Sequence, residues 1–149
     1  ALHEHGMVLA TAESCTGGLL AAACTSVAGS SDWFERGVVT YSNAAKTELL
    51  GVDAALIAAQ GAVSEAVVRA MAEGALARSP AQLALAVTGI AGPGGAVPGK
   101  PVGTVWLALA RSGAATQAER LELDGDRAAV REQTVHRALA LLLEAARPG

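Results

Sequence analysis

Apolar positions along the chain follow two spacings, one typical of strands and one typical of helices. Short runs of aliphatic and β-branched residues predict strands, and the run from 82 to 90 is almost entirely apolar, as in a strand buried on both faces. Strands are expected at residues 7–14, 36–42, 82–90, 103–110 and 115–123, the last two joined by a turn at Ser112 and Gly113.

Polar caps and glycines mark the boundaries of the predicted helices. Asn43 is predicted to cap a helix that stops at Gly51, and Asp53 to cap one that stops at Gly61. Asp126 is predicted to cap the final helix. Helices are expected at residues 16–27, 43–51, 53–61, 64–79 and 126–146.

The order of these elements predicts the fold class. Strands alternate with helices, which is typical of an α/β sheet covered by helices on both faces. We therefore expect a single-domain three-layer sandwich with a mixed, mostly parallel sheet. Residues 1–149 form one domain in this prediction, because no internal repeat and no long linker divides them.

The composition narrows the class of partner. Hydrophobic residues make up 52% of the chain and charged residues 17%, which is ample for a core, and the formal net charge is -3. Scattered basic residues and few aromatics argue against nucleic-acid binding. No apolar run is long enough to span a membrane and no signal-peptide pattern opens the chain, so we expect no membrane partner and a cytoplasmic protein with reduced thiols at Cys15 and Cys24.

Three unusual loops follow the first, second and third predicted strands, where α/β sheets bind ligands. They read AESCTGG, YSNAAK and TGIAGPGGAVPGKPVG. Histidine is scarce, since His3 and His5 lie near the chain start and His136 lies on the predicted polar face of the last helix. A Ser-His-Asp triad or a His-based metal site is therefore poorly supplied, and we expect no metal.

Ser14 and Lys46 form the leading catalytic hypothesis. With Asn43 as the cap, Lys46 is the third helical residue, where the helix dipole disfavours an ammonium and favours a neutral amine. A neutral amine can accept a proton from Ser14. Tyr41, at the end of the preceding strand, could relay or stabilise a proton. The alternatives are a tight turn at Ser14, a solvated Lys46 and a half-buried Tyr41.

Backbone groups in two of the loops are candidates for holding negative charge. The first N–H groups of the helix after Ser14, those of Thr16, Gly17 and Gly18, could hold an oxyanion. The loop from 88 to 103 could present a run of backbone donors to an anion, or could be only a long connection stiffened by prolines. The binding residues expected there are Thr88, Gly89, Ala91 and Gly92.

Arg131 is a second candidate for binding an anion. It shares one face of the predicted last helix with Val135, Ala138 and Leu142. A charged head at the end of an apolar stripe must find an anion or reach solvent. A structural salt bridge is the alternative.

Six motifs, in order and over nearly the whole chain, resemble the C-terminal domain of the competence-induced protein CinA, which also occurs as a free-standing nicotinamide mononucleotide deamidase. The motifs are TAESCTGG, GSSDWFERGVVTYSNAAK, GAVSEAVVRAMAEGA, TGIAGPGG, KPVGTVW and GDRAAVREQT. The resemblance implies an amidohydrolase that converts the carboxamide of nicotinamide mononucleotide to nicotinate mononucleotide and ammonia in pyridine nucleotide salvage. It implies a Ser-Lys mechanism at Ser14 and Lys46, with Tyr41 as the family's tyrosine.

One departure from the family pattern is visible, because Ala44 stands where the family has a glutamate after YSN. Any support that the glutamate gave to Lys46 is then lost. The alternative function is a nucleotide-sensing domain without turnover, of which Ala44 would be a sign. General amidase or peptidase activity is disfavoured by the small-residue loops.

The resemblance also bears on the neighbours of Ser14. Glu13 is expected to orient Lys46 or the ribose, with a solvent-exposed carboxylate as an equal alternative. Cys15 is the rival nucleophile, although no nearby His or cation favours its thiolate, and is otherwise expected to contact substrate. Phosphate becomes the expected anion for Arg131.

The expected partners follow from the same reasoning. The substrate is a small nucleotide, no cofactor is needed, and the chain is expected to form a homodimer. A covalently linked N-terminal domain in a longer gene product is also expected, since this domain often travels with another.

Overall fold

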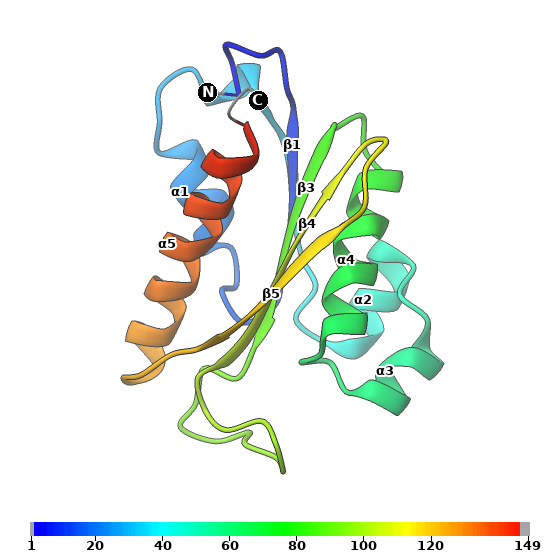
Figure 1. Cartoon of the computed structure of the whole chain (residues 1–149), viewed down its shortest axis with the longest axis vertical. Coiled ribbons are helices and arrows are strands. Elements are labelled where there is room, and N and C mark those ends of the chain that lie inside the picture. Colours follow the sequence, from blue (N-terminus) through cyan, green and yellow to red (C-terminus); the bar gives the residue numbers. More distant parts are fainter. Residues whose placement is uncertain (1, 147–149) are drawn as a thin grey trace.

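The computed structural model describes residues 2–146, which form one five-stranded sheet with helices on both faces (Figure 1). The strands lie in the order β2-β1-β3-β4-β5. Their bounds are β1 Leu9–Glu13, β2 Phe34–Val39, β3 Leu83–Gly89, β4 Thr104–Arg111 and β5 Gln117–Glu122. The helices are α1 Leu19–Thr25, α2 Asn43–Leu50, α3 Ala54–Gln60, α4 Glu65–Ala77 and α5 Arg127–Ala146, with a short 3₁₀ turn at Ser30–Asp32. The predicted three-layer α/β sandwich is confirmed.

The sheet is mixed, as expected, but its pairings divide evenly. Strand β1 pairs in parallel with β2 and with β3, whereas β3 with β4 and β4 with β5 are antiparallel. The sheet is therefore less parallel than the sequence suggested. The reason is that β3, β4 and β5 are joined without an intervening helix, whereas parallel neighbours usually need a helical crossover connection.

Side chains of alternating size separate the two faces of the sheet. In β3, Leu83, Leu85 and Val87 point into the core under α1 and α5, whereas Ala84 and Ala86 point into the core under α2, α3 and α4. Figure 1 shows these two helical layers on opposite sides of the sheet. Because the strand face toward α4 carries alanines, that helix packs close to the sheet.

The helix caps confirm most of the predicted boundaries. Asp53 and Asp126 accept hydrogen bonds from the first turns of α3 and α5. Gly51 and Gly61 end α2 and α3 as predicted. The prediction for α2 was wrong by one residue, because Ser42 is the cap and its side chain accepts from the Ala45 N–H.

The first helix is shorter than the sequence suggested. Gly18 is its N-cap with φ 109°, and Gly17 before it has φ 57°, so both glycines adopt left-handed conformations that other residues rarely reach. These two residues make a tight turn between Ser14 and the start of α1.

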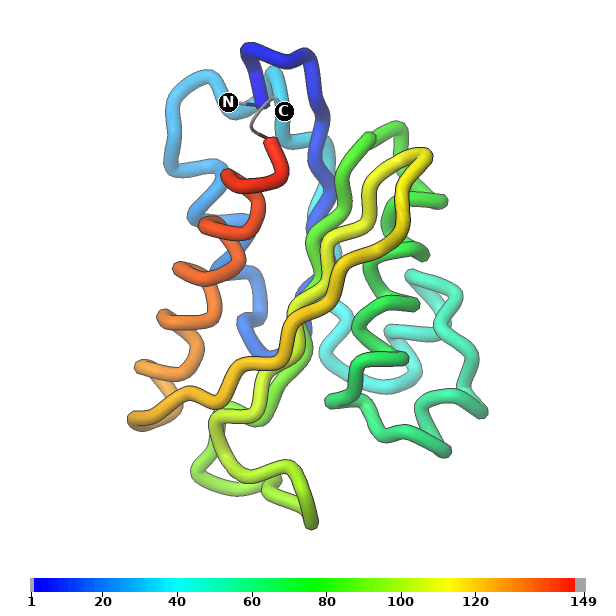
Figure 2. Tube along the Cα trace, in the orientation of Figure 1, coloured from blue at the N-terminus to red at the C-terminus, as the bar shows by residue number. Residues whose placement is uncertain are grey.

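The long loop from 90 to 103 extends beyond the end of the sheet (Figure 2). Val97 and Lys100 pair as an isolated bridge near its tip. Lys100 Nζ donates to the Gln60 carbonyl at 2.8 Å, and Arg120 donates to the Gly99 carbonyl at 3.0 Å. The loop is thus attached both to α3 and to β5.

The direction of the chain connections decides where a ligand can bind. The connection after β1 runs through α1 on one face, and the connection after its neighbour β2 runs through α2, α3 and α4 on the other face (Figure 1). Adjacent strands that continue to opposite faces leave a crevice at their carboxyl ends. Ser14 and Tyr41 lie directly after these two strands.

The close packing of α4 makes Gly74 a sensitive position. Alanine normally stabilises a helix interior relative to glycine by about 1 kcal/mol. At Gly74, however, a Cβ would collide with the Leu50 carbonyl oxygen at the end of α2. We expect Gly74→Ala to lower the free energy of unfolding by about 1–3 kcal/mol, measured by urea denaturation.

The matched control is Gly94→Ala, where nothing lies within 4 Å of the added Cβ and φ is not in the left-handed region. Its stability should be close to that of the original chain. A Gly74→Ala protein as stable as the original would show that α2 and α4 can separate at no measurable cost.

Candidate active site

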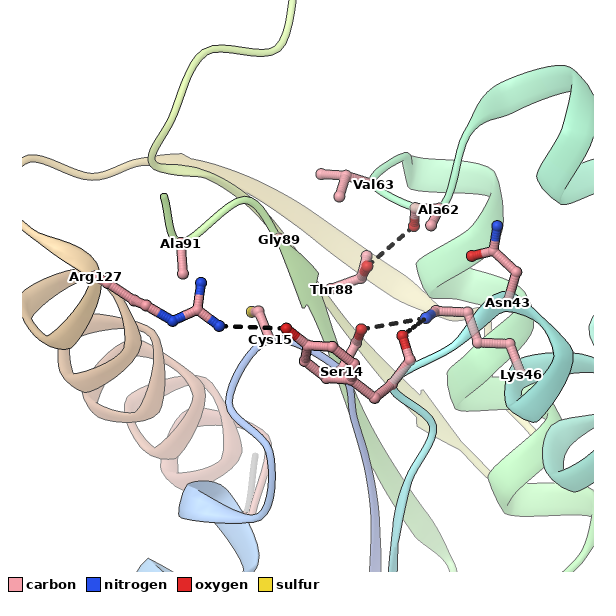
Figure 3. Close-up of a pocket in the computed structure, with 11 residues that line it drawn as sticks. Ser14, Cys15, Asn43, Lys46, Ala62, Val63, Thr88, Gly89, Ala91 and Arg127 are labelled. Carbon is pink, nitrogen blue, oxygen red and sulfur yellow. Dashed lines mark hydrogen bonds between the residues drawn. The ribbon is translucent and has the colours of Figure 1, made fainter. Parts of the chain in front are cut away.

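A cavity of about 240 Å³ lies at the carboxyl ends of the parallel strands, at the crevice between β1 and β2. Figure 3 shows Lys46 and Asn43 reaching toward it from α2, Arg127 from α5, and Ser14 between them. The cavity is lined by Ser14, Cys15, Tyr41, Asn43, Lys46, Ala62, Val63, Thr88, Gly89, Ala91 and Arg127. All three loops that the sequence singled out contribute to it.

The side chains of Ser14 and Lys46 meet at the base of the cavity. Lys46 Nζ lies 3.1 Å from Ser14 Oγ. Only 1% of Lys46 and 8% of Ser14 is exposed. Lysine is rarely fully buried without a carboxylate partner, so the groups that contact the Lys46 amine decide how its burial is tolerated.

Two backbone carbonyls complete the surroundings of the Lys46 amine. Nζ donates to the Thr40 carbonyl at 2.8 Å and to the Tyr41 carbonyl at 3.3 Å. A neutral amine has two N–H donors and one lone pair. A neutral amine that donates both N–H groups to these carbonyls would direct its lone pair toward Ser14 Oγ, where it could accept the hydroxyl proton.

Burial lowers the pKa of Lys46 from its ordinary value, because removal from water penalises the ammonium. The direction agrees with the sequence-based prediction, but the cause differs in part. Since Ser42 is the cap, Lys46 is the fourth rather than the third helical residue. Desolvation is the main cause of the lowered pKa.

Cys15 lines the same cavity but has different electrostatics. Burial raises the pKa of its thiol to about 11, and the lowering effects of its own backbone N–H and of Arg131 are smaller. The thiol is therefore protonated near neutral pH. This geometry favours Ser14 over Cys15 as the nucleophile, because only the thiolate is strongly nucleophilic.

Tyr41 and Arg127 meet at the mouth of the cavity. An N–H of Arg127 donates to the Tyr41 hydroxyl at 3.2 Å, and a second donates to the Gly92 carbonyl at 2.9 Å. Tyr41 is 62% exposed, so its ring covers the site from the solvent side. The contact links α5 to the segment between β2 and α2 across the cavity.

Arg131 does not line the cavity. Its guanidinium donates to the Cys15 carbonyl at 3.1 Å and to the Thr16 carbonyl at 3.3 Å. Both acceptors belong to the turn that carries Ser14. The structure therefore gives Arg131 two backbone acceptors, and the salt bridge expected as an alternative is absent among residues 2–146.

The turn after Ser14 differs from the expected row of free donors. The Gly17 N–H already donates to the Ser14 carbonyl at 3.0 Å. Within residues 2–146, the N–H groups of Cys15, Thr16 and Gly18 have no hydrogen-bond acceptor. Of these three residues, only Cys15 lines the cavity.

Glu13 is neither exposed nor in contact with Lys46. Its side chain is 1% exposed and turns away from the cavity toward α1. It accepts hydrogen bonds from the Thr16 hydroxyl at 2.6 Å and from the N–H groups of Leu20 and Ala21 at 2.8 and 3.0 Å. The prediction of a solvent-exposed carboxylate was wrong, and Glu13 makes no contact with Lys46 that would orient it.

The loop after β3 contributes part of what was expected. Thr88, Gly89 and Ala91 line the cavity, whereas Gly92 acts through its carbonyl on Arg127. A Cβ at Gly89 would come within 2.7 Å of Val105 and 3.2 Å of Cys15 Sγ. Only glycine fits between the strand and the cysteine at this position.

Four lining residues were missed by sequence reasoning. They are Asn43, Ala62, Val63 and Arg127. A signal existed for Arg127, because it precedes Arg131 by four residues and so shares its helical face. Asn43 was interpreted as a cap, which removed it from the list of candidates. No sequence signal identified Ala62 and Val63, which reach the cavity only through the packing of α3 and α4.

Residues 2–146 contain neither a candidate metal site nor a candidate membrane-spanning helix. No group of three or more His, Cys, Asp or Glu side chains there could hold a metal ion. No helix in this part of the chain is long and apolar enough to cross a membrane.

Comparison with known proteins gives a consistent set of matches. The family model described as the CinA C-terminal domain matches residues 1–146. A CinA-like protein of Akkermansia muciniphila is 56% identical over 146 residues, which are 98% of this chain and 35% of that protein. The chain thus spans about a third of the length of such relatives.

A shorter relative and a solved structure match over most of their own lengths. The nicotinamide-nucleotide amidohydrolase PncC of Pseudomonas putida is 58% identical over 143 residues, which are 96% of this chain and 89% of that protein. The crystal structure of the competence/damage inducible protein CihA from Agrobacterium tumefaciens superimposes with a TM-score of 0.95 at 45% identity, covering 98% of this chain and 89% of that one.

Proposed function

Because the chain belongs to the CinA C-terminal domain family, we propose that it hydrolyses the carboxamide of nicotinamide mononucleotide to nicotinate mononucleotide and ammonia. The observation that carries this proposal is the buried Lys46 amine 3.1 Å from Ser14 Oγ, in a cavity that also holds Arg127. The name of the Pseudomonas putida relative, a nicotinamide-nucleotide amidohydrolase, supports the choice of substrate.

The first half of the proposed reaction forms an acyl-enzyme. The neutral Lys46 amine accepts the Ser14 proton as Ser14 Oγ attacks the carboxamide carbon. The pyridinium ring withdraws electrons from this carbon and makes it electrophilic. Negative charge develops on the carbonyl oxygen, and the unpartnered N–H groups of Cys15 and Thr16 are the nearest candidates to hold it.

The second half releases both products. Lys46 gives its proton to the departing amide nitrogen, which leaves as ammonia. A water molecule then loses a proton to Lys46 and attacks the acyl carbon. Lys46 returns this proton to Ser14 Oγ as the ester bond breaks, so that Ser14 is regenerated and nicotinate mononucleotide leaves. Tyr41 can assist either proton transfer, since its backbone carbonyl holds Nζ and its hydroxyl lies at the mouth of the cavity.

The alternative of a sensing domain rested on Ala44, and the geometry weakens it. Ala44 is exposed and lies outside the residues that line the Ser14 cavity. Lys46 Nζ donates to two backbone carbonyls and lies within hydrogen-bond distance of Ser14 Oγ, and none of these contacts needs a glutamate at position 44. Turnover therefore stays the favoured function. The homodimer, the linked N-terminal domain and a cytoplasmic location stay predictions.

Replacement of Ser14 tests the proposed function. We expect Ser14→Ala to lower kcat for nicotinamide mononucleotide at least about a thousandfold, because the nucleophile is removed while the fold is kept. Released ammonia is the measurement. Cys15→Ala is the control and should keep turnover within about tenfold of the original. Loss of turnover in the cysteine variant with retention in the serine variant would assign the nucleophile to Cys15.

The pH profile tests the role of Lys46. Below its lowered pKa the amine is protonated and cannot accept the Ser14 proton, so kcat should rise as the pH passes through that pKa and level off above it. Lys46→Arg keeps a cation but cannot lose its proton at these pH values, and should be as inactive as Lys46→Met. An active arginine variant would mean that the lysine only binds substrate.

Arg127 replaces Arg131 as the proposed phosphate contact, because it is the cation that lines the cavity. An Arg-phosphate hydrogen bond contributes about 1.5–3 kcal/mol, so Arg127→Ala should lower kcat/KM for the nucleotide by about one to two powers of ten. The loss on nicotinamide riboside, which has no phosphate, should be much smaller.

The matched control is Arg137→Ala on the same helix, whose guanidinium pairs with Glu119 away from the cavity. It should leave both substrates unaffected. Equal losses on nucleotide and riboside in Arg127→Ala would mean that Arg127 acts through Tyr41 or the fold and does not bind phosphate.

A further inference from the structure

Glu13 is a buried carboxylate beside the proposed nucleophile, and the reaction proposed above does not use it. Its side chain is 1% exposed and faces α1, on the side of the sheet opposite to Lys46. The direction follows from the strand, because successive residues of β1 point to opposite faces. Glu13 therefore turns toward α1 while Ser14 turns toward α2.

Three hydrogen bonds account for this burial. Glu13 Oε1 accepts from the Thr16 hydroxyl and from the Leu20 N–H, and Oε2 accepts from the Ala21 N–H. Helix α1 begins at Gly18, which has no side chain to cap it. The carboxylate supplies that cap from the end of the neighbouring strand.

The backbone of the same residue reaches the other half of the dyad. The Glu13 carbonyl accepts from the Thr40 N–H at 2.7 Å, and the Thr40 carbonyl in turn accepts from Lys46 Nζ at 2.8 Å. Glu13 is thus bonded through its side chain to the turn that carries Ser14 and through its main chain to the segment that holds Lys46.

We propose that Glu13 is a positioning residue that sets the distance and direction of Ser14 Oγ relative to Lys46 by fixing the turn of residues 14–18 to the start of α1. It acts from behind the turn, and Arg131 holds the same turn by its carbonyls from α5. Glu13 thereby ties the Thr16 hydroxyl of the turn to the first N–H groups of α1, and Arg131 holds the carbonyl oxygens of the turn. The catalytic part of this inference rests on the proposed function.

Glutamine cannot replace this carboxylate. All three of its neighbours are donors, so an amide NH₂ at either oxygen position faces an N–H or a hydroxyl hydrogen. At least one hydrogen bond becomes a repulsive contact, and the turn must shift. Displacements of about 1 Å in an active site can cost a hundredfold in rate.

The test compares Glu13→Gln with Asp53→Asn. Each substitution changes a carboxylate that accepts a hydrogen bond from the first turn of a seven-residue helix, α1 for Glu13 and α3 for Asp53. Only α1 directly follows the turn that carries Ser14. We expect Glu13→Gln to lower kcat roughly tenfold to a hundredfold with KM within about twofold, and Asp53→Asn to change neither. Thermal unfolding of both variants shows how much of each is folded.

A second readout does not depend on the natural substrate. Phenylmethylsulfonyl fluoride is attacked by an activated serine, whose oxygen bonds to sulfur while fluoride leaves and the base takes the proton. Mass spectrometry of the peptide containing Ser14 should show labelling at least about tenfold slower in Glu13→Gln than in the original chain or Asp53→Asn. If the original chain is labelled at Ser14 but does not release ammonia from nicotinamide mononucleotide, the proposed substrate is wrong and the labelling rates still decide the role of Glu13.

Thr16→Val covers the case in which Glu13→Gln does not fold, because it removes only the 2.6 Å hydrogen bond from the Thr16 hydroxyl. Its labelling should also slow, by about threefold to tenfold. Folded Glu13→Gln or Thr16→Val protein labelled at the original rate would overturn the positioning role.

Discussion

The arrangement of the site depends on the burial of one amine. Lys46 is 1% exposed and has no carboxylate partner among residues 2–146, so the described chain satisfies its nitrogen with neutral groups. The carbonyls of Thr40 and Tyr41 do this and leave one direction open, toward Ser14. Removal from water penalises the ammonium, so the pKa of Lys46 is lowered from its ordinary value. Burial of Lys46 is unfavourable for its charged form, and the same effect favours the neutral amine that the proposed reaction uses as its base.

Strand alternation explains how one short motif serves both structure and chemistry. Glu13 and Ser14 are neighbours in sequence, yet they act on opposite faces of the sheet. Glu13 ties the end of β1 to α1, and Ser14 faces α2 across the crevice. Gly17 and Gly18 allow the chain to turn between Ser14 and α1, because both adopt a positive φ. The residues of this turn therefore have two roles: Glu13 anchors the turn to α1 on one face of the sheet, and Ser14 faces Lys46 on the other.

Arg127 and Arg131 lie on the same face of α5 but contact different parts of the site. Arg127 and Arg131 are one turn apart, so both point toward the sheet end. Arg131 reaches the backbone of the Ser14 turn, whereas Arg127 reaches the mouth of the cavity and the Tyr41 hydroxyl. The cavity is therefore closed by side chains from both helical layers, with the sheet edge as its base. Its shape depends on the packing of α5 as much as on the loops.

The sequence alone determined the features that rest on local patterns. Hydrophobic spacing predicted the five strands and the five α-helices that cover the two faces of the sheet. The small and polar residues of the loops after β1 and β2 identified Ser14 and Lys46 as neighbours in the site. Features that depend on where distant residues meet were decided by the tertiary structure. The burial of Glu13 against α1, and which of Arg127 and Arg131 lines the cavity, depend on contacts between separate elements. Residues 13 and 20, 41 and 127, and 15 and 131 meet only after the layers pack, and no spacing along the chain records such contacts.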